Sequence, residues 1–117
     1  MRAIICGASM ALTITTAEAV EPDYFSANYA LPGCKKYIAE ESALKVDEKI
    51  YLAGRCAGII HVISQPFVNG CANIPAQATM QQVMRVVVRY IEARPERMHE
   101  SFMNLAIEAV RDAWCRK

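Results

Sequence analysis

The sequence predicts an all-α fold, a small bundle of four helices, or alternatively five, that is held together by two disulfides. Apolar residues recur three and four positions apart in four segments, which is the spacing of residues on one helix face. Capping residues, prolines or glycines stand at the borders of these segments. No segment carries a convincing strand pattern, and there is no internal repeat. We therefore expect the helices to pack as one bundle around an apolar core.

Residues 1–19 are expected to be an export signal. The chain starts with the basic Arg2, continues as a run of apolar and small residues, and reaches an Ala-Glu-Ala triplet at 17–19. This run is short for a membrane anchor, and its end fits the small-x-small pattern of a signal peptidase site. Cleavage there would leave one periplasmic domain, residues 20–117, without an anchor. The alternatives are an ordinary buried first helix and a lipoprotein attached through Cys6, which lacks a preceding apolar stretch.

The first two helices are expected over residues 26–41 and 47–63, where apolar residues share one face. The N-caps expected for them are Ser26 and Asp47. Within the second helix, Gly54 and Gly58 are four residues apart and leave one side nearly bare. A close approach of another helix of the bundle is the expected reason for this pair.

Two more helices are expected in the C-terminal half. Thr79 and Gln82 match a capping box, so a third helix is expected over residues 79–93. The fourth helix is expected to begin at Pro95, because proline is favoured at the first helical position, and to run to about Cys115. Both segments have an apolar stripe opposite a charged one, which is typical of helices that cover a core.

The cysteines predict covalent support for this small core. Removal of residues 1–19 takes away Cys6 and leaves four cysteines, which are Cys34, Cys56, Cys71 and Cys115. An even number in an oxidising compartment predicts two disulfides, and the residues alone leave all three pairings open. No two of them form a C-x-x-C pair, and the two histidines stand at no metal-ligand spacing from them. We therefore predict no metal site.

Composition and motifs argue against nucleic-acid binding and against catalysis. The net charge is only +1, and the arginines between residues 85 and 97 are offset by glutamates, so no basic patch for nucleic acid is expected. No glycine-rich phosphate loop or other cofactor motif is present. The enzymatic alternative is an exported Cys-His hydrolase that uses His61, which would require a free thiolate. Four paired cysteines supply none, and His99 lies in early helix turns, so we predict no catalytic residue.

Several segments, taken in order, resemble a known family. They are residues 56–60, Cys71 with Pro75, Thr79 with Gln82, residues 87–97, and Ala109 with Trp114-Cys115. This order is similar to that of the Rap/Tai family of small periplasmic immunity proteins, over roughly Ser26 to Cys115. Two departures concern the loop and the C-terminus. Pro75 lies farther from Cys71 than the family pattern has it, and no proline precedes Cys115.

The resemblance implies a protein that protects bacteria from peptidoglycan amidases delivered by type VI secretion. Family members bind such an amidase as homodimers and use loops to block its cleft. The resemblance also implies the disulfide pairs Cys34 with Cys56 and Cys71 with Cys115. The alternative from a different functional class is a general periplasmic envelope-stress or chaperone-like helical protein.

The longest loop is the candidate site for a protein partner. Prolines and glycine interrupt residues 64–78, so we expect this segment to lack helix. A disulfide would anchor it through Cys71, and it is rich in side chains that can form hydrogen bonds. The residues expected to contact the partner are Ser64, Gln65, Asn69 and Asn73. The alternative is that the segment is a plain connector.

Overall fold

The computed structural model describes residues 22–40, 46–47, 49–70 and 74–115. These residues form five α-helices and one short 3₁₀ helix, and they include no named strand. The elements are α1 (Ala27–Ala39), α2 (Ile50–Ile63), α3 (Pro66–Asn69), α4 (Met80–Glu92), η1 (Pro95–Arg97) and α5 (Phe102–Trp114). The predicted all-α fold is confirmed, with the fifth helix of the alternative count present. The expected signal segment, residues 1–19, lies outside the described ranges.

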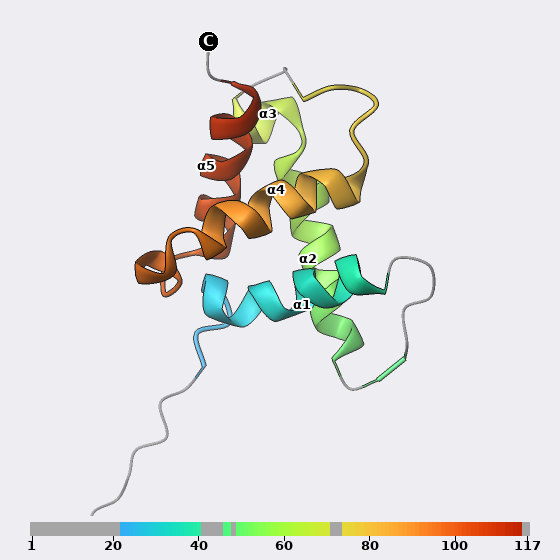
Figure 1. The fold of residues 1–117 in the computed structure, drawn as a ribbon, viewed down its shortest axis with the longest axis vertical. Helices are drawn as coiled ribbons and strands as arrows, with labels where there is room; N and C mark the ends of the chain where they lie inside the picture. The colour runs from blue at the N-terminus through green and yellow to red at the C-terminus, as the bar shows by residue number, and fades with distance from the viewer. Residues whose placement is uncertain (1–21, 41–45, 48, 71–73, 116–117) are drawn as a thin grey trace, which may run out of the picture.

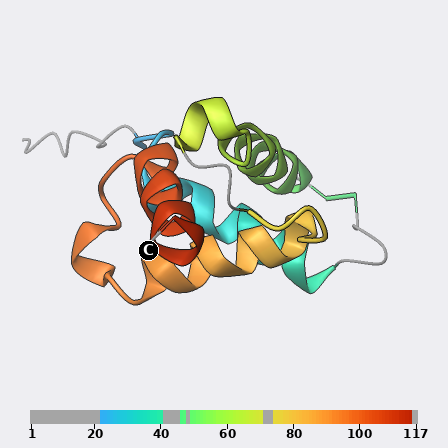
Figure 2. The same ribbon diagram turned by 90° about the horizontal axis from the view of Figure 1, so that it is seen from above.

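The helices surround one core. Helix α1 packs most extensively on α2 and also contacts α4 and α5, while α4 packs on α5. Figure 1 shows α4 crossing in front of α2, with α5 beside them. In Figure 2 the outer sides of α2 and α4 face opposite sides of the bundle. The bundle therefore presents two separate helix faces to solvent.

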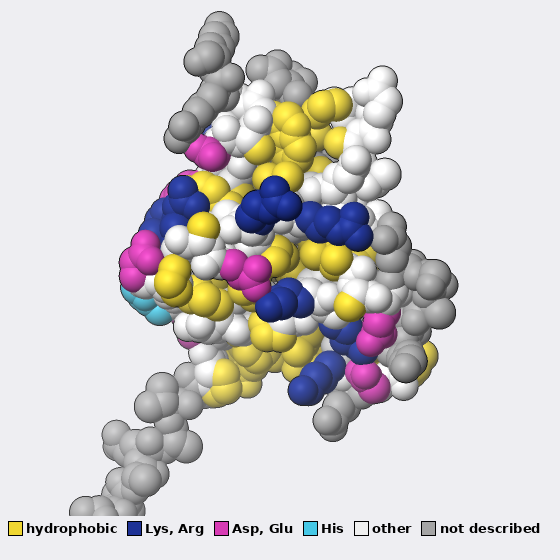
Figure 3. Space-filling model, in the orientation of Figure 1, with side chains coloured by type: hydrophobic (Ala, Val, Ile, Leu, Met, Phe, Trp, Pro, Cys, Tyr) yellow, Lys and Arg dark blue, Asp and Glu magenta, His cyan; other side chains and the backbone are white. Residues whose placement is uncertain are grey.

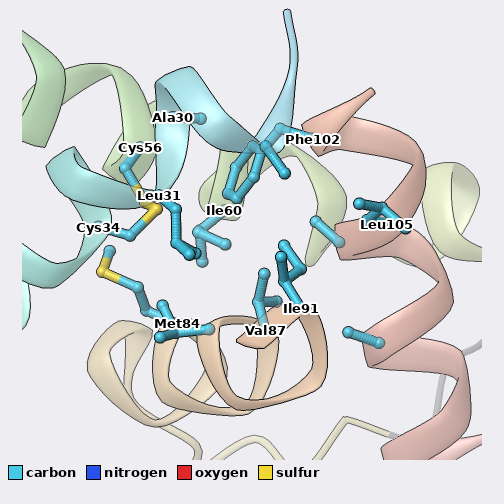
Figure 4. Close-up of a cluster of buried hydrophobic side chains, with 14 of the residues drawn as sticks. Ala30, Leu31, Cys34, Cys56, Ile60, Met84, Val87, Ile91, Phe102 and Leu105 are labelled. Atoms are coloured by element: carbon cyan, nitrogen blue, oxygen red, sulfur yellow. A yellow bond between two sulfur atoms is a disulfide. The ribbon is translucent and has the colours of Figure 1, made fainter. Parts of the chain in front are cut away.

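Large apolar side chains from four helices meet in the core. Leu31 of α1, Ile60 of α2, Met84 of α4 and Phe102 of α5 are almost fully buried and point toward one another (Figure 4). Burial of each such side chain contributes about 1.5–3 kcal/mol to folding. The inward stripes expected for the third and fourth helices supply two of these four, Met84 and Phe102, because their helical spacing was correct.

A disulfide joins the two N-terminal helices. Cys34 of α1 and Cys56 of α2 form it, with a Cα–Cα distance of 5.2 Å, at the edge of the core (Figure 4). This is the pair that the resemblance implied. The second expected pair includes Cys71, which lies outside the described residues, so the pair of Cys71 with Cys115 stays a prediction.

Two of the four predicted helix starts are confirmed and two are wrong. Ser26 caps α1 by accepting a hydrogen bond from the backbone N–H of Tyr29, as expected. Thr79 and Gln82 form the expected capping box at α4. The cap expected at Asp47 is wrong, since α2 begins three residues later and its N-cap is Lys49. The Asp47 carboxylate instead accepts from the Lys49 backbone N–H at 2.8 Å and so fixes the turn before the helix.

The expectation that the last helix begins at Pro95 is also wrong. Pro95 begins only the short η1, and α5 begins at Phe102 with Ser101 as its N-cap. The backbone between them pairs with the chain that leads into α1, through an isolated bridge between Ser26 and Ser101. The N–H of Phe102 donates to the carbonyl of Phe25 at 2.8 Å. These long-range bonds hold Ser101 away from helical geometry, with a ψ of 123°, so α5 begins only after it.

The glycine prediction was placed on the wrong residues. Gly54 and Gly58 are exposed, and a Cβ atom at either position would meet nothing within 4 Å. The close approach occurs at Gly33, where a Cβ atom would overlap the backbone carbonyl of Leu52. The bare side of α2 therefore faces solvent, while α1 supplies the glycine that lets α1 and α2 pack closely.

We expected the segment 64–78 to lack helix, and this is wrong for residues 66–69, which form α3. Pro66 occupies the first helical position of α3, where its missing N–H costs no hydrogen bond. Gly70 ends this helix with a positive φ of 68°, a conformation that glycine adopts without strain. Pro66 and Gly70, two of the residues that suggested a loop, thus mark the start and the end of a one-turn helix.

Candidate partner-binding surface

A cluster of exposed and half-buried aromatic side chains lies where the chain enters α1. It consists of Tyr24, Phe25 and Tyr29 around the start of α1, and of Tyr51 and Arg55 from α2; we call it the aromatic–arginine cluster. Phe25 is 75% exposed, Tyr51 57% and Tyr24 46%. Tyrosine, phenylalanine and arginine are enriched at protein interfaces, whereas the surface of a protein without partners exposes few large aromatic groups together.

Contacts within the aromatic–arginine cluster hold its members in place. The rings of Tyr24 and Tyr29 meet edge to face, with centroids 4.8 Å apart. The guanidinium of Arg55 lies 5.7 Å from the ring centroid of Phe25 and 5.5 Å from that of Tyr29. It also donates a hydrogen bond to the carbonyl of Tyr24. A cluster that is ordered before binding loses less side-chain entropy when a partner covers it.

The hydroxyls of Tyr29 and Tyr51 connect α1 to α2 at this surface. They are 2.8 Å apart and form a hydrogen bond. This bond, with a smaller contribution from desolvation, raises the pKa of Tyr29 above its ordinary value. Tyr29 therefore stays neutral at physiological pH. The positive charge of the cluster comes from Arg55.

The outer side of α2 continues the aromatic–arginine cluster along the helix. Its exposed residues follow helical spacing and are Tyr51, Gly54, Gly58, His61 and Val62. Beyond the end of α2, Phe67 of α3 is 85% exposed. A helix that is apolar on its outer as well as its inner side normally has a partner on both. Among the described residues, nothing lies within 4 Å of the Cβ positions at the two glycines.

The loop residues that we had selected mostly complete the end of α2. Ser64 Oγ donates to the carbonyl of Ile60 at 2.7 Å, and Gln65 Nε2 donates to that of His61 at 3.2 Å. The last carbonyls of a helix have no partner within the helix, so such bonds satisfy them. Ser64 and Gln65 thus have a local role in capping the end of α2.

The other two selected residues differ from this pair. Asn69 is 1% exposed, and its Nδ2 donates to the carbonyl of Ile63 at 3.0 Å, so its side chain belongs to the interior. Asn73 lies outside the described residues. Phe67, in the same segment, was not among the residues predicted to contact a partner. An aromatic residue next to a proline that starts a helix is a signal that could have identified it as a candidate.

Residues 26–115 match the family described as Rap1a immunity proteins. The chain belongs to this family. The match confirms the resemblance seen in the sequence and includes every described helix of the bundle. No curated protein and no solved structure matches the chain.

Among the described residues of this Rap1a family member, neither Cys34 nor Cys56 is a free thiol. Cys34 and Cys56, the cysteines nearest His61 in sequence on its N-terminal side, are nearly fully buried and joined to each other. His61 and His99 are both exposed. Within the part of the chain that the structure describes, no three His, Cys, Asp or Glu side chains lie together as a metal site would need.

The described helices of the Rap1a family member are short compared with the thickness of a bilayer. The longest, α2, has 14 residues, whereas about 20 apolar residues are needed to span a bilayer. No helix among the described residues is both long and apolar enough to do so.

Proposed function

We propose that this chain is a periplasmic immunity protein that binds and inhibits a peptidoglycan amidase delivered by type VI secretion. The observation that carries the proposal is its membership of the Rap1a immunity proteins. An immunity protein acts by occupying its toxin, so its function requires a binding surface and no catalytic group. The aromatic–arginine cluster and the outer side of α2 supply exposed, ordered residues of the kinds that dominate binding energies.

Export is part of the proposal. An inhibitor of an enzyme that acts on peptidoglycan must meet it in the periplasm, and residues 1–19 have the pattern of a cleavable signal. The disulfide between Cys34 and Cys56 supports this location, since disulfides persist in oxidising compartments.

We assign the outer side of α2 to the homodimer that the resemblance implies. This face carries Tyr51, Gly54, Gly58, His61 and Val62, with Arg55 at its border, and α2 contains no acidic residue. A low density of charge is typical of permanent interfaces between identical chains. The two bare glycine positions would let a helix of a second copy approach closely. In this arrangement Phe67 and Gln65, at the end of the same face, lie beside the dimer and remain candidates for contact with the amidase.

The chaperone-like alternative is supported by one observation, the exposure of Phe25, Tyr51, Val62 and Phe67. A general chaperone would use such apolar surface to hold many unfolded clients. It predicts that the purified chain suppresses aggregation of unrelated proteins at low pH, whereas a specific immunity protein has no such activity.

Co-expression tests the proposal directly. A candidate amidase, sought among the genes next to the gene for this chain, is directed to the periplasm of a sensitive bacterium, alone or with the chain. Full-length chain should restore growth, and a version that lacks residues 1–19 should not, because it stays in the cytoplasm. Lysis that continues at the same rate with full-length chain present, and with its accumulation in the periplasm verified, would reject the proposal.

A further inference from the structure

The outer side of α4 carries two exposed arginines one turn apart, Arg85 and Arg89, with apolar hollows on both sides. We propose that this arginine ridge docks a protein segment that presents a carboxylate flanked by apolar side chains. If the proposed immunity function is correct, the segment belongs to the amidase. The ridge lies on the side of the bundle opposite the outer face of α2 (Figure 2), so both faces can be occupied at once.

The first hollow lies between α1 and α4 and has a volume of about 340 Å³. Ile38 and Ala39 of α1 and Val88 of α4 form its apolar part, while both arginines of the ridge stand along its border. Figure 3 shows this side of the molecule, with Lys and Arg side chains across α4 and hydrophobic side chains exposed on either side of them.

Two further hollows lie on the other side of the arginine ridge. One, of about 440 Å³, is lined by Pro75, Val86 and Trp114 together with Arg85. The next, of about 280 Å³, lies between α4 and α5 and is bordered by Arg89 and by Ala113 of α5. Each arginine therefore separates two places where an apolar side chain of a partner could be buried. Burial of one such side chain is worth about 1.5–3 kcal/mol.

The charges of this surface define the chemistry of its partner. Lys35 is already paired with Glu92 at 2.7 Å. The Arg89 guanidinium forms no hydrogen bond or ion pair with any residue that the structure describes. An arginine offers a planar set of N–H donors that fits a carboxylate with two parallel bonds. Because Arg89 lies between two apolar hollows, it fits a partner segment in which an acidic residue has apolar neighbours.

The same features favour a protein segment over an anionic membrane. The hollows are concave, so a flat bilayer surface would leave their apolar walls uncovered. Glu92 and Asp112 lie among the arginines and would repel anionic headgroups. A folded or extended protein segment can place its own cations near these carboxylates, which a uniform layer of anionic lipid cannot do.

A displayed library of random peptides tests the inference without knowledge of the partner. The full mature chain is used as bait, and retained peptides are sequenced and synthesised for affinity measurements. We expect Asp or Glu next to aliphatic or aromatic residues in the retained set. Retention of peptides without acidic residues, or of no peptides at all, would overturn the proposal.

Variants then locate the binding site. Arg89→Glu should weaken binding of a selected peptide at least about tenfold, since it replaces attraction with repulsion. Ala39→Trp should do the same by filling the first hollow, because Ala39 is exposed and its replacement disturbs no core contact. The matched controls are Arg111→Glu and Asn104→Trp on the outer side of α5, where both residues are exposed. Equal binding by Arg89→Glu and Arg111→Glu would overturn the proposal.

A second probe separates this inference from the proposed function. If the amidase binds the wild-type chain and the Arg89→Glu variant equally well, the immunity function stands and the arginine ridge is not its docking surface. If acidic peptides bind at the ridge but the amidase binds nowhere, the ridge stands and the proposed function fails. Binding to phosphatidylglycerol vesicles that exceeds peptide binding and is lost in Arg89→Glu would show a membrane surface instead and overturn the proposal.

Discussion

Gly33 of α1 lies directly against the backbone carbonyl of Leu52 in α2, so that no Cβ atom fits between the two helices. The next residue, Cys34, forms the disulfide to Cys56. A close backbone contact and a covalent bond thus occur side by side at the crossing of α1 and α2. This crossing positions Tyr29 against Tyr51 and so assembles the aromatic–arginine cluster.

The glycines of the two helices should respond in opposite ways to replacement by alanine. Gly33→Ala forces α1 and α2 apart and should lower the free energy of unfolding by about 1–3 kcal/mol. Gly58→Ala, in open space in the single chain, should raise that of the monomer by up to about 1 kcal/mol, because alanine is the better helix former. Urea denaturation measures both at a protein concentration low enough to keep the chains monomeric. Equal effects of the two replacements would contradict the close contact at Gly33.

Asn69 should matter for folding more than Gln65 does, although both side chains donate to carbonyls at the end of α2. The Asn69 bond is buried, so Asn69→Ala leaves the Ile63 carbonyl without this donor and should cost about 1–3 kcal/mol. Asn69→Asp should cost more at neutral pH, because its negative charge faces the negative end of the helix dipole. Gln65→Ala, whose bond is exposed, should cost well under 1 kcal/mol. A larger loss from Gln65→Ala in thermal unfolding would refute this ranking.

The ion pairs of Arg97 should make stability depend on acid. Arg97 contacts Glu100 at 2.8 Å and Glu108 at 2.7 Å. The guanidinium lowers the pKa of both carboxyls below their ordinary value, chiefly through these hydrogen bonds. Their contribution is therefore complete above the unfolded-state pKa, near 4.5, and is lost as the pH falls through the lower folded-state pKa values.

Arg97→Gln tests this pH dependence. In the variant the two pKa values return toward normal, so stability should fall less steeply between about pH 5 and pH 2 than in the wild type. The urea midpoint, followed over this range, is the measurement. Arg111→Gln removes the same charge from an exposed position of α5 and should keep the wild-type slope. Asp47, whose pKa is lowered chiefly by Lys36, titrates in all three proteins. Identical slopes in all three would contradict the assignment to Arg97.

The proposed dimer through α2 can be separated from folding, because Gly58 has room for a side chain in the single chain. Gly58→Arg should dissociate the dimer by placing a long charged side chain at its centre. Asn104→Arg adds the same charge to the outer side of α5, where Asn104 is exposed, and should leave the dimer intact. Sedimentation velocity gives the mass of each. A monomeric wild type, or a dimeric Gly58→Arg variant, would exclude this interface.

Local signals in the sequence were sufficient to predict four of the five α-helices that the structure describes. The capping box of Thr79 and Gln82 and the cap at Ser26 depend only on neighbouring residues, and both were correct. The start of α5 was predicted wrongly, because it depends on a backbone hydrogen bond between Phe102 and Phe25, which are distant in sequence. Propensity at Pro95 could not reveal that competing contact.

The surface could be predicted less well than the core. The spacing of Gly54 and Gly58 indicated a bare helix side, but spacing does not say whether a neighbour in the same chain covers it. The aromatic–arginine cluster is built from two separate segments, and only the crossing of α1 and α2 brings Tyr29 to Tyr51. The selection of Asn69 failed to anticipate its burial, since the short helix α3 that turns it inward was expected to be loop.

Inhibition of the purified amidase tests the central claim most directly. An amidase against which the chain protects in the co-expression test is incubated with isolated peptidoglycan. Hydrolysis is followed as the mature chain is added with its disulfide between Cys34 and Cys56 intact. If the chain is an amidase inhibitor, hydrolysis falls to background once the chain is in excess. We also expect the heat-unfolded, reduced chain to have no effect. Full hydrolysis in the presence of a saturating excess of folded chain would contradict the claim that this protein is an amidase inhibitor.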